Sequence, residues 1–415
     1  MVLGGSTLFN FFWGAQLRSH SSSSRLWIGI GFNVALLSLY KYVPALVHSH
    51  QSASWTHLVM PIGISFWTFQ GLSYLFDQYR EEDLDPTLLE FALYMTFAPT
   101  VLSGPICRLG DMLPQFRQVT QRNWDDVRHG VQRIWLGMLM TSAALLLANG
   151  LHQGKGLNAA FAGTSDSAID TWVLAFGYGL QLFLDFAGYT HIVIGIARLF
   201  GIRLVENFNR PFLSSTISEF WTRWHMSLSF WIRDYVFLPL ATVRRETWWR
   251  QFALLCSMVV FGIWHRATLL FLVWGVYHGI LLVLHRWEQQ ISRRLDLNWS
   301  GTLSNLISTI LTIAAVSAGW LFFRANTLHD GLYMFSRLFT PAAYLNHALS
   351  PDLYSMIFVV GGVCLLSWVL AGPADADRAA LDWLPIELRF AGYALASYLI
   401  LFRAAVPQAF AYTQF

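Results

Sequence analysis

Charged residues are scarce in this chain of 415 residues, at 12% of the total, where a typical soluble domain carries about 25%. Hydrophobic residues make up 55% and aromatic residues 16%, and the mean hydropathy is +0.44. This composition excludes an ordinary soluble domain and predicts an all-α integral membrane protein with many passes. The net charge of +3 is too small to indicate a nucleic-acid partner.

Cysteine is also rare, and its pattern argues against metal chemistry. The three cysteines, Cys107, Cys256 and Cys364, form no CxxC or Cys/His pattern, and each lies in or beside an apolar run. We expect them to pack as small core residues. The chain also lacks an HExxH motif, a GxSxG motif, paired catalytic carboxylates and a glycine-rich phosphate loop. We therefore expect no metal site and no bound cofactor.

Apolar runs near the ~20 residues needed to cross a bilayer recur along the chain without an internal repeat. Seven are long: 26–44, 58–76, 131–149, 267–285, 303–323, 353–371 and 388–405. Four are shorter or interrupted: 6–17, 88–104, 228–241 and 251–264. We expect about nine to eleven membrane segments, some not fully spanning, in one domain over residues 1–415. The opening residues lack a basic region and a cleavage site, so the first segment is expected to act as the insertion signal.

Two segments do not fit a simple span. The run 171–200 is too long for one and contains Asp185, Gly188 and His191, so we predict two segments or a broken helix. The run 228–241 is too short and holds an Arg233–Asp234 pair. Such backbone is tolerated at membrane depth only inside protein or beside a wet cavity, which predicts a re-entrant or interfacial helix.

The basic residues predict the orientation of the loops, because cytoplasmic loops carry an excess of Lys and Arg. Only Lys41 and Lys155 are lysines, and the other basic residues are arginine. The arginine-rich segments, expected on the cytoplasmic side, are 105–133, 198–210, 223–250 and 286–294. The segments with few positive charges, expected on the outer side, are 45–57, 150–170 and 340–352.

Two Trp-His segments are the strongest candidates for chemistry, because an ionisable side chain within apolar sequence is costly. They read WTRWHMSLS at 221–229 and FGIWHRAT at 261–268. A neutral imidazole can accept a proton from an alcohol near neutral pH, so His265 is either a general base or a histidine bonded between helices. His225 is either a second active-site group or a structural histidine at the start of a helix.

Other polar residues in the apolar sequence have competing interpretations. His278 follows His265 by 13 residues, roughly 20 Å along a continuous helix, which favours a structural role. Asp185 either pairs with an arginine or orients a histidine. Arg223 and Arg233 have the donor geometry that suits phosphate, and the alternative for Arg233 is an internal salt bridge with Asp234.

Several motifs in a consistent order resemble the membrane-bound O-acyltransferase (MBOAT) family. Besides the two Trp-His segments they are ENFNRPF (206–212), PIGISFWTFQ (61–70), SGPI (103–106), DFAGY (185–189), WLFFRA (320–325) and the ending FAYTQF (410–415). The resemblance is to the bacterial branch with the membrane subunit of alginate O-acetyltransferase, a cousin of the teichoic-acid D-alanyl transferase. It covers most of the chain.

The resemblance implies a helical bundle with a central tunnel, in a bacterial inner membrane. The acyl donor, expected to be acetyl-CoA, would enter from the cytoplasm, and the polysaccharide acceptor from outside. His265 would be the catalytic histidine and His225 the second one. Donor binding would fall to Trp264 and the three arginines Arg223, Arg233 and Arg266. The acyl group would reach the polysaccharide directly or through an extracytoplasmic partner protein.

The chain departs from the family pattern at two positions that bear on the site. Arg266 stands where many relatives have glycine, so it would either bind the donor phosphate or narrow the tunnel. His191 replaces an acidic residue, which bears on the acceptor. Compared with the longer members of the family, the chain is also expected to lack the first two membrane segments. A transporter, which also uses buried His and Asp, and a non-catalytic scaffold of a polysaccharide export complex are the alternatives.

Overall fold

The computed structural model describes residues 1–44, 59–82, 84–118, 123–151, 154–296 and 301–370, and seven isolated residues between 385 and 398. In this part of the chain every regular element is a helix, and one isolated bridge joins Phe208 to Trp224. The all-α prediction is confirmed. The expected outer loop 45–57 and the apolar run 388–405 lie wholly or mostly outside the described residues.

Long apolar helices confirm the multi-pass membrane prediction. In the described part of the chain, five helices are long and apolar enough to cross a bilayer: α8 (Trp124–Asn149), α10 (Ala168–Leu199), α15 (Leu269–Arg294), α16 (Thr302–Arg324) and α18 (Pro351–Leu370). At a rise of 1.5 Å per residue, even the 20 residues of α18 extend for about 30 Å, which is the thickness of the hydrocarbon core.

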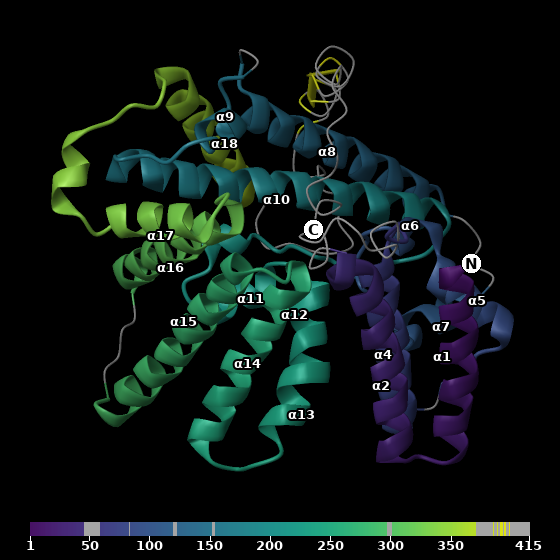
Figure 1. Ribbon diagram of the computed structural model, residues 1–415. Coiled ribbons are helices and arrows are strands. Elements are labelled where there is room, and N and C mark those ends of the chain that lie inside the picture. The colour runs from purple at the N-terminus through teal and green to yellow at the C-terminus, as the bar shows by residue number, and fades with distance from the viewer. Residues whose placement is uncertain are drawn as a thin grey trace, which may run out of the picture. The chain divides into compact units, whose positions relative to one another are not determined.

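The described residues group into two compact units, and the first comprises Met1–Val131 with Val193–Glu206. In it α1 (Val2–Ser19), α2 (Ser23–Leu37) and α4 (Ile64–Tyr79) pack side by side (Figure 1). The buried amides of Asn10 and Asn33 join α1 to α2, with Nδ2 of Asn33 donating to Oδ1 of Asn10 at 2.8 Å. The other helices that lie wholly in this unit are η1 (Ser38–Tyr42), α5 (Leu88–Thr96), α6 (Ala98–Val101) and α7 (Leu109–Arg117).

The second unit comprises Gln132–Ile192 with Asn207–Phe415 and holds all the sequence-predicted site residues. Its shorter elements are α9 (Leu157–Ala160), η3 (Pro211–Leu213), α11 (Ile217–Arg223), α12 (Met226–Ile232), η4 (Arg233–Phe237), α13 (Leu238–Ala241), α14 (Thr247–His265), α17 (Leu328–Arg337) and η5 (Pro341–Leu345). From Met226 to Ala241 the backbone is helical throughout, with a π-helical turn in the middle. These 16 residues, roughly 24 Å long, are too few to span, as predicted for the re-entrant segment.

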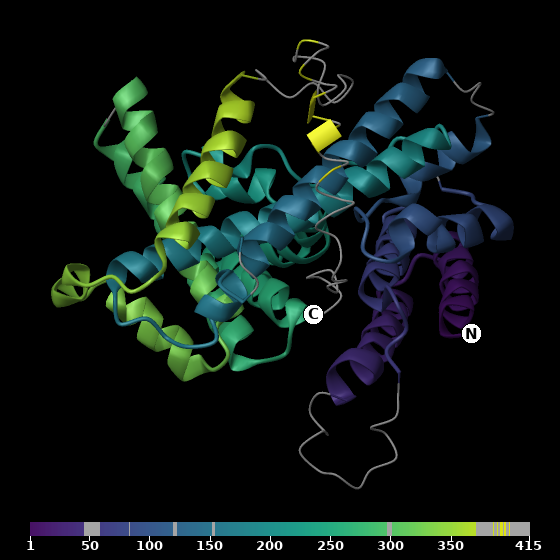
Figure 2. The same cartoon turned by 90° about the horizontal axis from the view of Figure 1, so that it is seen from above.

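The expected break in the run 171–200 is wrong, because α10 continues through Asp185, Gly188 and His191. Gly188 serves the packing of α10 against α8 instead. A Cβ atom added at Gly188 would lie 2.8 Å from the carbonyl oxygen of Gly137, so the missing side chain lets the two backbones approach. The two helices lie side by side in Figures 1 and 2.

The hairpin of α14 and α15 fixes the position of the second Trp-His segment (Figure 1). A three-residue turn, 266–268, joins the helices, closed by the Thr268 N–H donating to the Arg266 carbonyl oxygen at 2.8 Å. An added Cβ at Gly262 would lie 2.3 Å from the Phe271 carbonyl oxygen, and one at Gly275 would lie 2.5 Å from that of Met258. The two glycines therefore allow the close crossing, which places His265 at the closed end of the hairpin.

Candidate active site

His225 lies at the junction of α11 and α12, in the left-handed region of backbone space with φ 42° and ψ 54°. Such a conformation is uncommon for a residue other than glycine, although histidine is among the residues that adopt it more often. Thr216 caps the start of α11 by accepting the Glu219 N–H at 3.1 Å. Strained residues of this kind cluster at functional sites, so the backbone itself marks His225.

The buried side chain of Asn207 holds this junction in place. Its Oδ1 accepts the Ser227 hydroxyl at 2.6 Å and the Ser227 N–H at 3.3 Å, and its Nδ2 donates to the Thr190 hydroxyl at 3.3 Å. Its carbonyl oxygen accepts the Met226 N–H at 2.9 Å. Asn207 was not singled out from the sequence, although it stands in the ENFNRPF motif.

His225 itself is fully buried, and its ring contacts the ring of Phe186 on α10 at a centroid distance of 4.6 Å in an edge-to-face geometry. Because burial in low dielectric disfavours the charged form, this environment favours a neutral imidazole. The Asn207 network therefore presents a neutral ring at the start of α12.

His265, the last residue of α14, is 2% exposed and surrounded by aromatic rings. The Phe261 ring stacks on it at 5.3 Å, and the rings of Phe323 and Trp274 meet it edge to face at 5.1 and 5.7 Å. The predicted donor-binding residue Trp264 contacts the same imidazole at 4.8 Å. The surrounding rings shield this imidazole from water.

A chain of ring contacts joins the two predicted histidines. Trp224, the neighbour of His225, lies 5.0 Å from Trp320; Trp320 lies 5.5 Å from Phe323, which contacts His265. The structure thus brings both Trp-His segments into one aromatic cluster built from α11, α14, α15 and α16. The prediction that they form one site is consistent with this arrangement.

His278 also belongs to this cluster, against the separation expected along a continuous helix. Its ring lies 4.8 Å from that of Trp274, which in turn lies 5.7 Å from His265. The helix is interrupted at residues 266–268, and α15 returns along α14. The 13 residues between the two histidines therefore do not separate them by three turns of one helix.

Two of the predicted phosphate-binding arginines are engaged in ion pairs. Arg223 pairs with Glu219 one turn earlier at 2.6 Å. Arg233 pairs in bidentate fashion with Asp234, at 2.6 and 3.1 Å. The internal salt bridge offered as the alternative for Arg233 and Asp234 is therefore present, on the π-helical turn. The Arg233 side chain remains 53% exposed.

Arg266 adjoins His265, and Asp185 adjoins the residue whose ring contacts His225. Arg266 follows His265 directly and is exposed, with an extended backbone that carries it out of α14. Asp185 is half-buried on α10, beside the Phe186 ring that contacts His225. Within the described residues no group of three metal-ligating side chains comes together.

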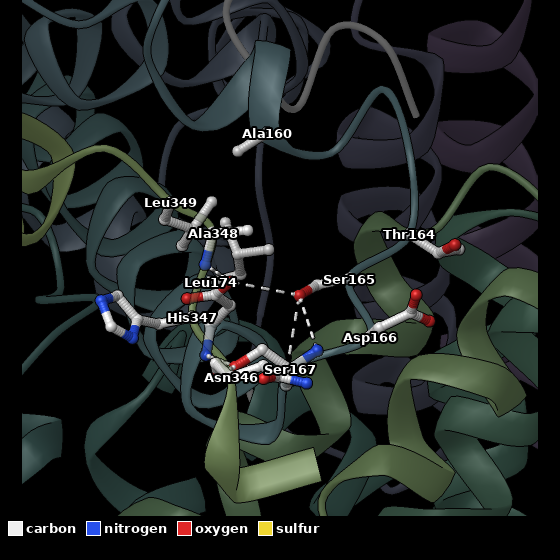
Figure 3. Close-up of a pocket in the computed structure, with 11 residues that line it drawn as sticks. Ala160, Thr164, Ser165, Asp166, Ser167, Leu174, Asn346, His347, Ala348 and Leu349 are labelled. Carbon is white, nitrogen blue, oxygen red and sulfur yellow. Dashed lines mark hydrogen bonds between the residues drawn. The ribbon is translucent and has the colours of Figure 1, made fainter.

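A second polar cluster lies in two segments expected on the outer side, and the sequence did not predict it. A pocket of about 280 Å³ is lined by residues of the loops 164–167 and 346–349 (Figure 3). The fully buried carboxylate of Asp170, at the start of α10, joins them. It accepts the Ala348 N–H at 2.8 Å, the Ser165 hydroxyl at 3.4 Å and the Tyr354 hydroxyl of α18.

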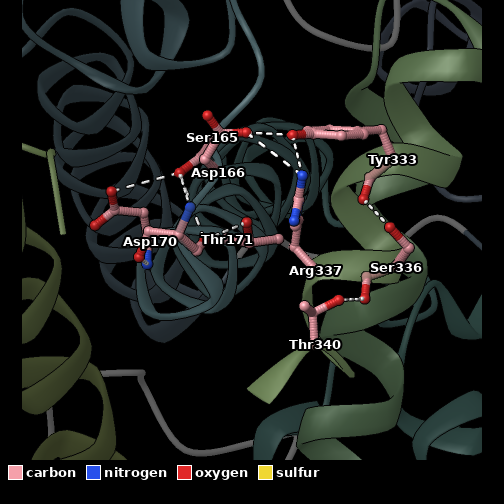
Figure 4. Close-up of polar contacts among 9 residues, drawn as sticks. Ser165, Asp166, Asp170, Thr171, Tyr333, Ser336, Arg337 and Thr340 are labelled. Carbon is pink, nitrogen blue, oxygen red and sulfur yellow. Dashed lines mark hydrogen bonds and ion pairs between the residues drawn. The ribbon is translucent and has the colours of Figure 1, made fainter. Parts of the chain in front are cut away.

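Beside this pocket, Asp166 reaches α17 (Figure 4). It accepts a hydrogen bond from the Tyr333 hydroxyl and lies 3.8 Å from the Arg337 guanidinium, which also contacts Tyr333. The two expected outer segments are thus joined to each other and to α17 by polar contacts.

Comparison with known proteins decides the family. The model of the MBOAT, membrane-bound O-acyltransferase family, matches residues 46–324. A probable alginate O-acetylase of Pseudomonas putida is 32% identical over 354 residues, which are 82% of this chain and 70% of the relative. The chain belongs to the membrane-bound O-acyltransferase family. The resemblance of its motifs is confirmed.

Further relatives of this MBOAT chain carry the same acceptor name or two others. The probable alginate O-acetylase of Pseudomonas aeruginosa is 32% identical over 82% of the chain, and the chain spans 66% of that relative's length. A peptidoglycan O-acetyltransferase of Helicobacter pylori is 29% identical over 80% of the chain and 68% of the relative. A teichoic acid D-alanyltransferase of Bacillus subtilis is 29% identical over 71% of the chain and 76% of the relative.

Proposed function

We propose that this chain is a membrane O-acetyltransferase that moves acetyl groups from acetyl-CoA to hydroxyls of an extracytoplasmic polysaccharide. The observation that carries the proposal is the buried His265 at the end of α14, within an aromatic cluster that also takes in the second Trp-His segment, in a chain of the MBOAT family. A buried imidazole shielded from water can act as the general base that the reaction needs.

In the proposed reaction His265 acts as general base. It takes the proton of the acceptor hydroxyl while the oxygen attacks the thioester carbonyl, so a C–O bond forms. The C–S bond then breaks, and the thiolate leaves with the proton returned by the imidazolium. General base catalysis of this kind contributes typically 10²–10⁴-fold, and holding both substrates in line supplies the larger proximity effect.

The proposed donor contact is Arg266 rather than the other two arginines. Arg223 and Arg233 already pair with carboxylates, whereas Arg266 is exposed and adjacent to the proposed base. A guanidinium presents a fork of donors that matches phosphate oxygens. Arg266→Gly is expected to raise the KM for the acyl donor.

The relatives' names, which include alginate, peptidoglycan and teichoic acid, support a polysaccharide acceptor. Two of the three activities named are acetyl transfers, which favours acetyl over D-alanyl. We propose that acetyl passes to the polysaccharide directly or through an extracytoplasmic partner protein. The polar pocket around Asp170 lies in segments expected on that side.

The deciding experiment measures acetyl transfer from radiolabelled acetyl-CoA by protein in lipid, for wild type, His265→Ala and the exposed-histidine control His329→Ala. Loss of transfer in His265→Ala alone, with folded protein retained, is the expected result. Since the wild type can depend on its partner and glycan, an inert preparation is repeated with both. Continued glycan modification in cells by His265→Ala would instead favour the transporter or scaffold alternative.

A further inference from the structure

Four ring side chains beside the proposed base form what we call the indole–imidazole cluster: Trp221, Trp274, His278 and Trp320. Trp221 is 7% exposed, Trp274 and Trp320 are each 1% exposed, and His278 is fully buried. The His278 ring lies 4.8 Å from Trp274, 5.2 Å from Trp221 and 6.5 Å from Trp320. The cluster therefore joins α11, α15 and α16 around one imidazole.

The polar atoms of this cluster have no hydrogen-bond partner among the described residues. This holds for the three indole N–H groups and for both ring nitrogens of His278. A buried tryptophan N–H usually finds a partner, and leaving a buried polar group without one is costly. Five polar atoms without a hydrogen-bond partner on four neighbouring rings indicate that the cluster forms hydrogen bonds to a ligand.

The fold does supply partners to tryptophans elsewhere. The fully buried Trp67 donates its indole N–H to the Ile62 carbonyl oxygen at 3.4 Å, and Trp249 donates to that of Leu240 at 2.7 Å. Unmet indole groups are thus not a general property of this chain.

The chemistry of the cluster defines the ligand it suits. Three N–H donors and an imidazole carry no fixed charge, so they suit neutral oxygen atoms, whereas a buried anion would need a cationic partner. Flat aromatic walls with a few polar atoms are typical of small-molecule sites. Trp274 contacts both His278 and His265, so a ligand held here lies next to the proposed base.

We propose that the indole–imidazole cluster is a binding subsite for a neutral, oxygen-bearing part of a substrate, held by hydrogen bonds one indole away from His265. The proposal rests on the proposed function, since it assigns the subsite to the same reaction. Carbonyl oxygens of the acyl donor's arm and hydroxyl groups of the acceptor share this chemistry, so the experiment must separate these two sources.

The test compares His278→Phe and Trp320→Phe, which remove polar atoms and keep an aromatic ring, with Trp67→Phe as the control matched in size to Trp320→Phe. The KM for acetyl-CoA and the KM for an acceptor oligosaccharide are measured separately, and the dissociation constants of both are measured by equilibrium binding. We expect each test variant to raise one of the two constants by a few-fold to about tenfold, the effect of one lost hydrogen bond. The constant that rises identifies the source.

Thermal unfolding supplies the second readout. Trp320→Phe and Trp67→Phe lose the same buried ring volume, but only Trp67→Phe also removes a hydrogen bond within the protein. Trp320→Phe should therefore lower Tm by less than Trp67→Phe, and Trp67→Phe should leave both constants unchanged. Unchanged constants for both substrates in both test variants, or a fall in Tm like that of the control, would overturn the subsite. If the wild type transfers no acetyl but binds a substrate with a dissociation constant that His278→Phe raises, only the proposed function is contradicted.

Discussion

His225 has two features that a substitution can test separately: a backbone with a positive φ of 42° and an imidazole side chain. Asparagine tolerates this conformation better than most residues but cannot act as a base. We expect His225→Asn to keep Tm near that of wild type while acetyl transfer falls at least tenfold. Wild-type rates in this variant would make His225 structural.

At Asp170 a single carboxylate joins loops that are remote in the sequence. Its partners Ala348 and Tyr354 are 178 and 184 residues away. Asp170→Asn keeps the size of the side chain but replaces one accepting oxygen by a donor, so we expect a loss of about 1–3 kcal/mol in the free energy of unfolding. Thermal or denaturant unfolding beside the exposed-site control Asp352→Asn checks this, and equal stabilities would contradict it.

The sequence could identify His225 and His265 because tryptophan-flanked histidines in apolar runs are rare and costly. It could not identify Asp170, because an aspartate in a polar loop resembles any solvated residue until its distant partners are known. Asn207 has the same difficulty: its role depends on Thr190, Met226 and Ser227, which no local pattern associates with it.

At the scale of the helix, the crossing of α14 and α15 depends on glycine. A Cβ at Gly275 would lie 2.5 Å from the Met258 carbonyl oxygen, so Gly275→Ala must push the helices apart, at a cost of about 1–3 kcal/mol. The displacement would also move His265, so we expect both Tm and acetyl transfer to fall.

The matched control is Gly362→Ala on α18, where an added Cβ meets nothing within 4 Å. Removing glycine from a helix interior there is expected to leave stability unchanged or raise it by up to about 1 kcal/mol. Equal effects of the two substitutions on unfolding would show that the close crossing does not matter.

Two predictions about helices were wrong or incomplete because they considered a single helix and not the helix packed against it. Gly188 was taken as a break in 171–200, yet it is where α8 approaches α10. His278 was placed three turns from His265, yet the turn at 266–268 folds α15 back. In the sequence, a glycine that breaks a helix looks the same as a glycine that lets two helices cross closely. Only the packing of the neighbouring helix distinguishes the two.

At the scale of the whole molecule, the arginine distribution predicts the orientation in the membrane. We expect a cysteine at His347 to react with a membrane-impermeant maleimide in intact cells, and one at Arg245 to react only after the membrane is opened. Both positions are exposed, and the three native cysteines are first replaced by alanine. The reverse labelling would place the Asp170 pocket on the cytoplasmic side.

The membrane class was predictable from the sequence because apolar length and low charge are properties of single segments. The assembly of the aromatic site was not, since it requires α11, α14, α15 and α16 to meet. The single domain over residues 1–415 stays a prediction, as do the central tunnel and the acetyl-CoA donor.

The position of His265 at the last residue of α14 has an electrostatic consequence. The aligned peptide dipoles of a helix leave about half a negative charge at its carboxyl end. When the proposed base takes up a proton, the new positive charge forms there. The 19-residue helix thus favours the imidazolium by roughly 0.3–1 kcal/mol, and by up to about 2 kcal/mol where water is excluded. The backbone of α14 thus stabilises the charge that the proposed reaction creates on His265.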